Sequence, residues 1–200
     1  MNIVFDLGNV LLNFNPQQYL NKLNLSQRER EKLYENIFNS EEWIKLDRGT
    51  IPQKQAIVKM KERCPELEDK IVKIMNEWQH ILTPRNKTVA ILKKLASANY
   101  PLYVLSNFHK QAFQYVRDEY SFFKLFDGIV ISAHENCIKP EPEIYETLIQ
   151  RYHINTNETV FIDDSSQNVK GAEKMGIKAI QYKNEIKLKE DLNSILKEDI

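Results

Sequence analysis

The sequence has few cysteines, no net charge and no long apolar run, and each of these three features argues against one class of protein. Its 200 residues include only Cys64 and Cys137, too few for a disulfide framework or a thiolate metal site. We therefore expect two ordinary thiols in a cytoplasmic protein. The 28 basic residues balance the 28 acidic ones, which argues against nucleic-acid or membrane-surface binding through bulk charge. No apolar run approaches the roughly 20 residues of a membrane-spanning helix, and no signal peptide is expected before the first strand.

The overall amino-acid composition is that of a globular protein. Hydrophobic residues make up 42% of the chain and charged residues 28%, and a chain of this length can bury a substantial core. We expect one domain, or one domain that carries an insertion.

A short apolar run at the start of the chain, interrupted by a carboxylate, organises the predicted fold. Residues 3–5 are apolar, and the turn formers Gly8 and Asn9 follow, so a buried strand is predicted to end near Asp6. A carboxylate at the end of a buried strand is costly unless it is paired, binds metal or takes part in chemistry. Asp6 is thus a candidate functional residue; an Asp that only caps the next turn is the alternative.

The chain after this strand divides into a helical block and an alternating part. Residues 15–83 show helical periodicity and no strand pattern, with a capping box at Ser26 and Glu29. They are predicted to form a small all-helical domain inserted into a core of residues 1–14 and 84–200. In the core, apolar strand patterns alternate with helices, which predicts an α/β fold with a doubly wound parallel sheet. The further predicted strands are 102–105, 128–131, 159–162 and 177–182.

Polar residues that can take part in catalysis or binding follow several of the predicted strands. Because parallel strands open on the same edge of a sheet, these residues are expected to converge. Clustered carboxylates favour a hard divalent cation such as Mg²⁺. A lysine beside them offsets charge, a hydroxyl and backbone N–H groups hold phosphate oxygens, and an aspartate can attack phosphorus. The set comprises Asp6, Ser106, Asn107, Lys139, Asp163 and Asp164.

Four ordered motifs resemble those of the haloacid dehalogenase superfamily. They are residues 5–10 (Phe-Asp-Leu-Gly-Asn-Val), the strand that ends in Ser106, residues 139–145 from Lys-Pro onward, and residues 161–172 around the Asp-Asp pair. The opening motif is similar to that of bacterial α-D-glucose-1-phosphate phosphatase-like members. The resemblance implies that the inserted helical block at 15–83 is a C1 cap, a lid over the active site.

The resemblance also implies residue roles. Asp6 would be the nucleophile and a Mg²⁺ ligand, and Lys139 would steady it. The backbone carbonyl of Gly8 would be a second metal ligand and Asp164 a third. Asp163 would be an outer-shell or alternative ligand. Ser106 and Asn107 would bind phosphate.

One position departs from the family pattern. Most phosphatases of the superfamily carry an aspartate two residues after the nucleophile as general acid and base, and this chain has Gly8 there. The enzyme could then be slow, could prefer a good leaving group such as that of a sugar 1-phosphate, or could recruit another acid. Asp47 and His109 are the candidates, and the order between them stays open. Asp47 is also expected to contact substrate from a turn between helices, a plain turn being the alternative.

The sequence thus predicts a Mg²⁺-dependent phosphatase of small phosphorylated metabolites, acting as a monomer or homodimer through an aspartyl-phosphate. Two alternatives remain. One is a metal-independent 2-haloacid dehalogenase, since those relatives also lack an acid at the position of Gly8. The other is a catalytically weakened relative that binds a metabolite or a protein.

Overall fold

Five parallel strands form one sheet in the order β3-β2-β1-β4-β5. The structure, a computed structural model, describes residues 1–197. The predicted α/β class and parallel sheet are confirmed, and each strand lies within one residue of its predicted ends. The strands are β1 (Asn2–Phe5), β2 (Leu102–Ser106), β3 (Gly128–Ile131), β4 (Thr159–Asp163) and β5 (Lys178–Gln181).

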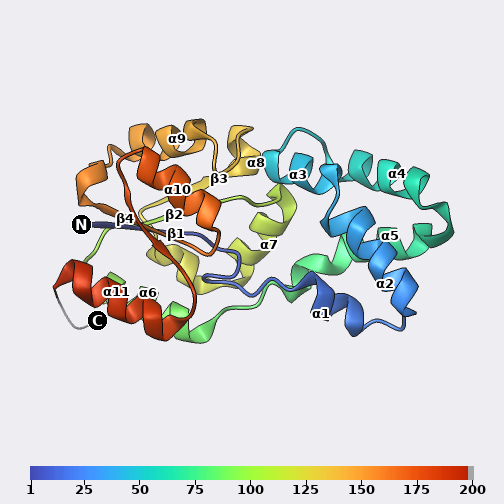
Figure 1. Cartoon of the computed structure of the whole chain (residues 1–200), viewed down its shortest axis with the longest axis horizontal. Helices are drawn as coiled ribbons and strands as arrows, with labels where there is room; N and C mark the ends of the chain where they lie inside the picture. Colours follow the sequence, from blue (N-terminus) through green and yellow to red (C-terminus); the bar gives the residue numbers. More distant parts are fainter. Residues whose placement is uncertain (198–200) are drawn as a thin grey trace.

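The sheet is buried on both faces. Successive side chains of each strand point to opposite sides of the sheet, and helices cover both sides. In β1, Ile3 and Phe5 join one hydrophobic cluster and Val4 joins the other, and all three side chains are fully buried. Figure 1 shows helices in layers above and below the strands. One face is covered by α6 (Asn86–Ser97), α7 (Lys110–Glu119) and α11 (Glu185–Leu196), and the other by α9 (Pro142–Tyr152) and α10 (Ser166–Lys174).

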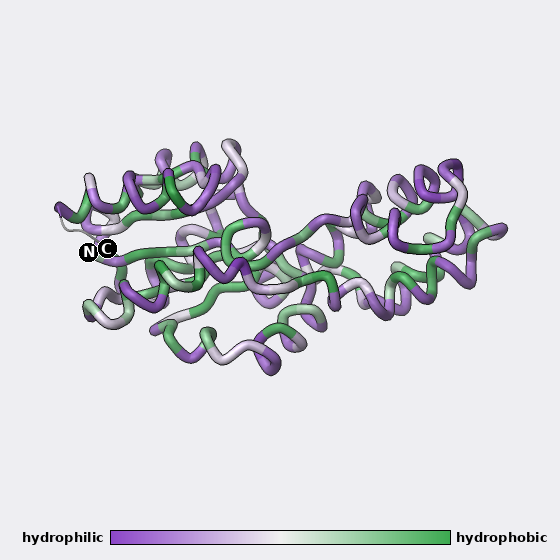
Figure 2. Tube along the Cα trace, turned by 90° about the horizontal axis from the view of Figure 1, so that it is seen from below, coloured by the Kyte–Doolittle hydropathy of each residue, from purple (hydrophilic) through white to green (hydrophobic). Residues whose placement is uncertain are grey.

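The residues between β1 and α6 form a second body of helices, called here the helical lobe (residues 16–81). It stands beside the carboxyl ends of the strands, while the N-terminus lies at the opposite end of the core (Figure 1). In Figure 2 the strands are mostly hydrophobic, whereas the helices of both bodies alternate hydrophilic and hydrophobic segments. The lobe contains α1 (Pro16–Asn21), α2 (Gln27–Leu33), the π-helix η1 (Tyr34–Phe38), α3 (Glu41–Arg48), α4 (Gln53–Arg63), η2 (Pro65–Leu67), α5 (Glu68–Glu77) and η3 (Trp78–Ile81).

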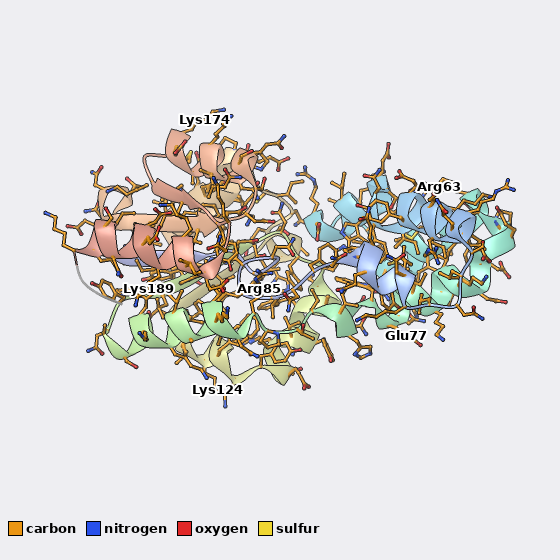
Figure 3. The ribbon with its side chains drawn as sticks, turned by 60° about the horizontal axis from the view of Figure 1, so that its bottom comes forward. Arg63, Glu77, Arg85, Lys124, Lys174 and Lys189 are labelled. Atoms are coloured by element: carbon orange, nitrogen blue, oxygen red, sulfur yellow. The ribbon has the colours of Figure 1, made fainter. Side chains whose placement is uncertain are left out.

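Two chain segments join the lobe to the core, and they are hydrogen-bonded to each other. The N–H of Asn13 donates to the carbonyl of Thr83 (2.7 Å), and the N–H of Arg85 donates to the carbonyl of Leu11 (2.8 Å). Figure 3 shows Arg85 near the middle of the molecule, whereas Arg63 and Glu77 lie out in the lobe. The lobe is therefore attached through a paired, short connection.

Local signals in the sequence explain several helix ends. The predicted capping box is present: the side chain of Ser26 accepts from the N–H of Glu29, and the Glu29 carboxylate accepts from the N–H of Ser26. One expectation is wrong: Asp47 does not lie in a turn but in the last turn of α3. The helix stops only at Gly49, whose φ of +78° is the left-handed conformation that glycine tolerates. Among residues 1–197, no helix is both long and apolar enough to cross a membrane.

Candidate active site

Asp6 follows β1 directly and is held by side chains from two other segments. Its Oδ1 accepts hydrogen bonds from the Ser106 hydroxyl (2.7 Å) and the Lys139 ammonium (2.7 Å). Burial raises the pKa of Asp6 to about 7; the Lys139 charge opposes this rise and the Asp163 charge adds to it. The second oxygen, Oδ2, lies on the side of Gly8, 3.9 Å from where a Cβ on that glycine would be. Asp6 thus has one oxygen fixed by partners and one directed toward Gly8.

Lys139 is a buried cation shared between two carboxylates. Only 3% of the residue is exposed, and its Nζ donates to Asp6 Oδ1, to Asp163 Oδ2 (2.6 Å) and to the carbonyl of Leu105 (2.8 Å). All three ammonium protons are therefore used. Burial alone would lower the pKa of Lys139, but the charges of Asp163 and Asp6 outweigh it and hold the pKa above its usual value. Lys139 is a permanent charge at this site.

The backbone of Lys139 is clamped by the Asn107 side chain. The Oδ1 of Asn107 accepts from the N–H of Lys139 (2.8 Å), and its Nδ2 donates to the Lys139 carbonyl (3.0 Å). Both ends of the Asn107 amide are thus engaged with the chain rather than pointed at a ligand. This clamp sets where the lysine enters the site.

Three carboxylates come together at the ends of β1 and β4. Asp163 is fully buried and accepts from the N–H of Ser165 (2.8 Å) and from Asn168 Nδ2 (3.1 Å) in addition to Lys139. One oxygen each of Asp6, Asp163 and Asp164 lies within 4.8 Å of the others. Burial, and then the Asp163 charge, raise the pKa of Asp164. Oxygen donors so grouped match the preference of a hard divalent cation. We call Asp6, Lys139, Asp163 and Asp164 the carboxylate cluster.

The helical lobe brings a further carboxylate, Asp47, to the same place. Its backbone carbonyl accepts from the hydroxyl of the buried Ser132, which also accepts from the N–H of Phe108. Its side chain is 23% exposed, and its Oδ1 lies 3.5 Å from Nε2 of His109. Removal from water, followed by the Asp6 charge, raises the pKa of Asp47 to about 8.

Two further contacts dock the end of α3 on the core. The Arg48 guanidinium pairs with the Glu141 carboxylate through two hydrogen bonds, at 2.7 and 2.5 Å. The backbone of Gly49 packs so closely on Ala133 that an added Cβ would lie 2.2 Å from the Ala133 carbonyl oxygen. These contacts, together with the Ser132 bond, fix Asp47 over the core.

A small cavity of about 70 Å³ lies between the lobe and the core. His109 lies in its wall, and its ring centroid is 4.2 Å from that of Trp43 and 5.1 Å from that of Trp78. Within residues 1–197 neither ring nitrogen of His109 has a hydrogen-bond partner, and burial lowers its pKa to about 3. We call this space the aromatic cavity. Its lining is Gly8, Phe14, Trp43, Asp47, Trp78, Leu82, Asn107, Phe108 and His109.

The structure places the candidate residues named from the sequence at two neighbouring sites. Asp6, Ser106, Lys139, Asp163 and Asp164 lie in or beside the carboxylate cluster, whereas Asp47 lines the aromatic cavity, which Gly8 and Asn107 also reach. Nothing in the sequence indicated a role for Ser132, and Trp43 and Trp78 could be recognised only as buried residues, not as cavity residues. Their periodicity shows only that they are buried, not which surface they face.

Comparison with known proteins agrees with this geometry. The family model for haloacid dehalogenase-like hydrolases matches residues 3–182. The sesquiterpene phosphatase astK of Aspergillus oryzae is 27% identical over 174 residues, which are 87% of this chain and 85% of that protein.

Solved structures of this family superpose on the chain. A HAD family enzyme of Bacteroides thetaiotaomicron, solved in complex with magnesium and inorganic phosphate, has a TM-score of 0.72 at 26% identity, covering 91% of this chain and 93% of its own. The L-2-haloacid dehalogenase of Xanthobacter autotrophicus has a TM-score of 0.65 at 17% identity, covering 89% and 75%, and so shares the fold. The match over residues 3–182 places this chain in the haloacid dehalogenase-like hydrolase family.

Proposed function

We propose that this hydrolase is a Mg²⁺-dependent phosphatase of small phosphorylated metabolites that forms an aspartyl-phosphate on Asp6. The observation that carries the proposal is the buried Lys139 ammonium, hydrogen-bonded at once to Asp6 and Asp163, with Asp164 close by. A fixed cation and a group of carboxylates at one site suit the transfer of a dianionic phosphoryl group.

Asp6 would supply covalent catalysis. Because Oδ1 is held by Ser106 and Lys139, Oδ2 is the oxygen free to attack phosphorus from the side of Gly8. Attack forms an aspartyl-phosphate and releases the alcohol, and water then cleaves the acyl phosphate. Lys139 keeps Asp6 oriented and balances negative charge that develops on the phosphoryl oxygens.

Phosphate oxygens would be held by backbone N–H groups at two helix starts, and by Ser106 when its hydroxyl, which donates to Asp6 in this structure, turns to the substrate. Helices α7 and α10 both begin within four residues after a strand that carries site residues, and helix N-termini attract anions. For Asn107, whose side-chain amide is engaged with Lys139, we propose a contribution from the backbone N–H.

The proposed metal ligands are Asp6, Asp164 and the backbone carbonyl of Gly8, with Asp163 as an outer or alternative ligand. The close approach of three carboxylate oxygens without enough cations to neutralise them fits a divalent ion. When bound, Mg²⁺ would offset the charge of the carboxylates and of the phosphoryl group.

The helical lobe would act as the cap, and the aromatic cavity would receive the leaving alcohol. At about 70 Å³ with aromatic rings in its wall, the cavity suits a small group with an apolar face. Two classes fit: a sugar 1-phosphate, whose anomeric oxygen leaves readily, and the phosphate of a small apolar alcohol. The similarity to astK, a sesquiterpene phosphatase, supports the second class.

The test is phosphate release from a panel of hexose 1-phosphates, hexose 6-phosphates, p-nitrophenyl phosphate and short prenyl phosphates, with Mg²⁺ or EDTA. The variant is Asp6→Asn, and the matched control is Asp69→Asn, an exposed carboxylate in the lobe. We expect release that requires both Mg²⁺ and Asp6 and that Asp69→Asn leaves unchanged. Release unaffected by Asp6→Asn, or none from any member of the panel, would contradict the proposal.

The dehalogenase alternative can be separated in the same preparation. The three grouped carboxylates of Asp6, Asp163 and Asp164 are more acid than a metal-free displacement of halide requires. We therefore expect no chloride release from 2-chloropropionate, with or without EDTA. Chloride release that persists in EDTA would favour the dehalogenase.

A further inference from the structure

Transfer of a phosphoryl group from an ordinary alcohol needs a proton donor on the leaving oxygen. Without one, an alkoxide must depart, and general acid catalysis typically contributes about 10² to 10⁴ in rate. Asp6 Oδ2 faces Gly8, and Gly8 has no side chain. The donor must therefore come from another residue that shares the space beside Gly8.

The lining of the aromatic cavity restricts the choice. Among the described residues around it, only Asp47 and His109 carry a group that can donate a proton to an alkoxide. His109 is wedged against Trp43 and Trp78 and is 4% exposed. Burial lowers the pKa of its ring to about 3, which disfavours the imidazolium form that would donate a proton.

Asp47 has the geometry that the role requires. It hangs from the last turn of α3 over the core, its carbonyl bonded to Ser132 and its neighbour Arg48 paired with Glu141. Its Oδ1 lies 3.5 Å from the His109 imidazole, and it shares the cavity with Gly8. Its raised pKa, about 8, agrees with a carboxyl that keeps its proton at neutral pH.

We propose that Asp47, supplied by the helical lobe, is the catalytic residue that protonates the leaving alcohol and then deprotonates the attacking water. This inference rests on the proposed phosphatase function and deepens it.

The two half-reactions balance. In the first, Asp6 Oδ2 bonds to phosphorus while the bond from phosphorus to the alcohol oxygen breaks; that oxygen keeps the electron pair and takes the Asp47 proton. In the second, a water oxygen bonds to phosphorus and gives one proton to the Asp47 carboxylate, while the bond from phosphorus to Asp6 breaks. Alcohol and phosphate leave, and both aspartates return to their starting forms.

The test uses Asp47→Asn and a series of leaving groups of similar size. The substrates are p-nitrophenyl, phenyl and benzyl phosphate, whose alcohols are progressively weaker acids. Rapid-quench measurement of alcohol release in the first turnover isolates the first half-reaction. We expect Asp47→Asn to slow benzyl phosphate about 10² to 10⁴-fold and p-nitrophenyl phosphate less than about tenfold, because nitrophenolate leaves without a proton. Asp69→Asn should change neither.

A rescue variant makes the test specific. A Cβ added at Gly8 meets only Asp6 Oδ2, at 3.9 Å, so the backbone there leaves room for the first atom of an aspartate side chain. In Asp47→Asn/Gly8→Asp we expect a substantial part of the benzyl phosphate rate to return. Equal slowing of all three substrates in Asp47→Asn, or no slowing at all, would overturn the inference.

These outcomes are distinct from failure of the proposed function. That function fails if wild-type release of nitrophenol does not depend on Asp6, whereas the inference fails on the ratio between substrates in a protein whose Asp6-dependent release is intact. Asparagine keeps the size of the side chain, and the Ser132 bond is to the backbone carbonyl of residue 47. The substitution therefore leaves the docking of α3 in place.

Discussion

The carboxylate cluster and the aromatic cavity lie next to each other but differ in how their buried polar groups are hydrogen-bonded. In the cluster, Lys139 and Asp163 are almost wholly buried, and every polar atom of the lysine has a partner. In the cavity, within the described part of the chain, His109 is equally buried and its two nitrogens have none. The cluster holds its lysine firmly in the charged form, whereas burial in the cavity favours the neutral forms of His109 and Asp47.

This difference separates two chemical tasks. A group that stabilises charge on a phosphoryl centre must hold one ionisation state, and complete hydrogen bonding together with opposite charges achieves that. A group that exchanges a proton must be able to exist in both states, and removal from water together with a nearby carboxylate brings the pKa of an aspartate toward neutrality.

The largest effect is expected when the cluster loses its cation. Lys139→Met would leave Asp6 and Asp163 facing each other as buried acids without the ammonium. Breaking a buried ion pair costs about 3 to 5 kcal/mol, and we expect urea denaturation to show a loss of that size together with loss of phosphate release. Lys110→Met, at an exposed lysine, is the matched control and should change stability by less than about 0.5 kcal/mol. A loss no greater than the control would contradict the account of the cluster.

The next effect tests the neutral state of His109. Its pKa is lowered from 6.5 to about 3 in the folded protein, so its neutrality costs no stability above pH 6.5, and stability is lost as pH falls from 6.5 toward 3. His109→Phe removes this term. Between pH 7.5 and 4.5, by linkage over about two pH units below 6.5, we expect the variant to gain about 2 to 3 kcal/mol relative to wild type. Parallel stability curves of the two proteins against pH would refute the buried neutral imidazole.

Two glycines allow the close fit of the lobe to be compared with the open space in the cavity. Gly49→Ala would force a left-handed residue and a contact of 2.2 Å with the Ala133 carbonyl, costing about 1 to 3 kcal/mol from the backbone conformation alone. Gly8→Ala meets nothing nearer than 3.9 Å and should change stability by less than about 0.5 kcal/mol. Thermal unfolding of the two variants measures both, and equal losses would mean that the docking contact is not as tight as described.

The smallest effect concerns the ion pair that joins the lobe to the core. The side chains of Arg48 and Glu141 are 30% and 34% exposed, and exposed pairs are worth about 0.2 to 1 kcal/mol. A double-mutant cycle with Arg48→Met and Glu141→Gln should give a coupling in that range that decreases at high salt. A coupling that salt leaves unchanged would show that the bidentate geometry, rather than the net charge, holds the lobe.

Much of the fold could be predicted because its signals are local. Apolar runs bounded by turn formers located the strands, and the Ser26 capping box marked a helix start. The convergence of Asp6, Ser106 and Asp163 followed from the rule that parallel strands open on one edge. Each of these inferences needs only a few neighbouring residues or the direction of the strands.

The rest of the site depends on contacts between distant segments. Nothing near Asn107 in the sequence indicates that its amide clamps a residue 32 positions away, and Ser132 contacts Asp47 across 85 positions. Asp47 was expected in a turn because the charged pair Asp47-Arg48 precedes Gly49, but α3 continues through both and ends at Gly49, where φ is positive. Periodicity indicates burial and cannot say which surface is covered.

The paired connection between lobe and core has a consequence for selectivity. Because segments 11–13 and 83–85 are bonded to each other, any rotation of the lobe about them would carry Asp47 and Trp43 away from Asp6 as one unit. The proton donor and the nucleophile then meet only over a ligand small enough to let α3 seat on Ser132 and Ala133. We expect an oversized phosphate ester to occupy the open protein as an inhibitor, so that substrates are discriminated by turnover rather than by affinity.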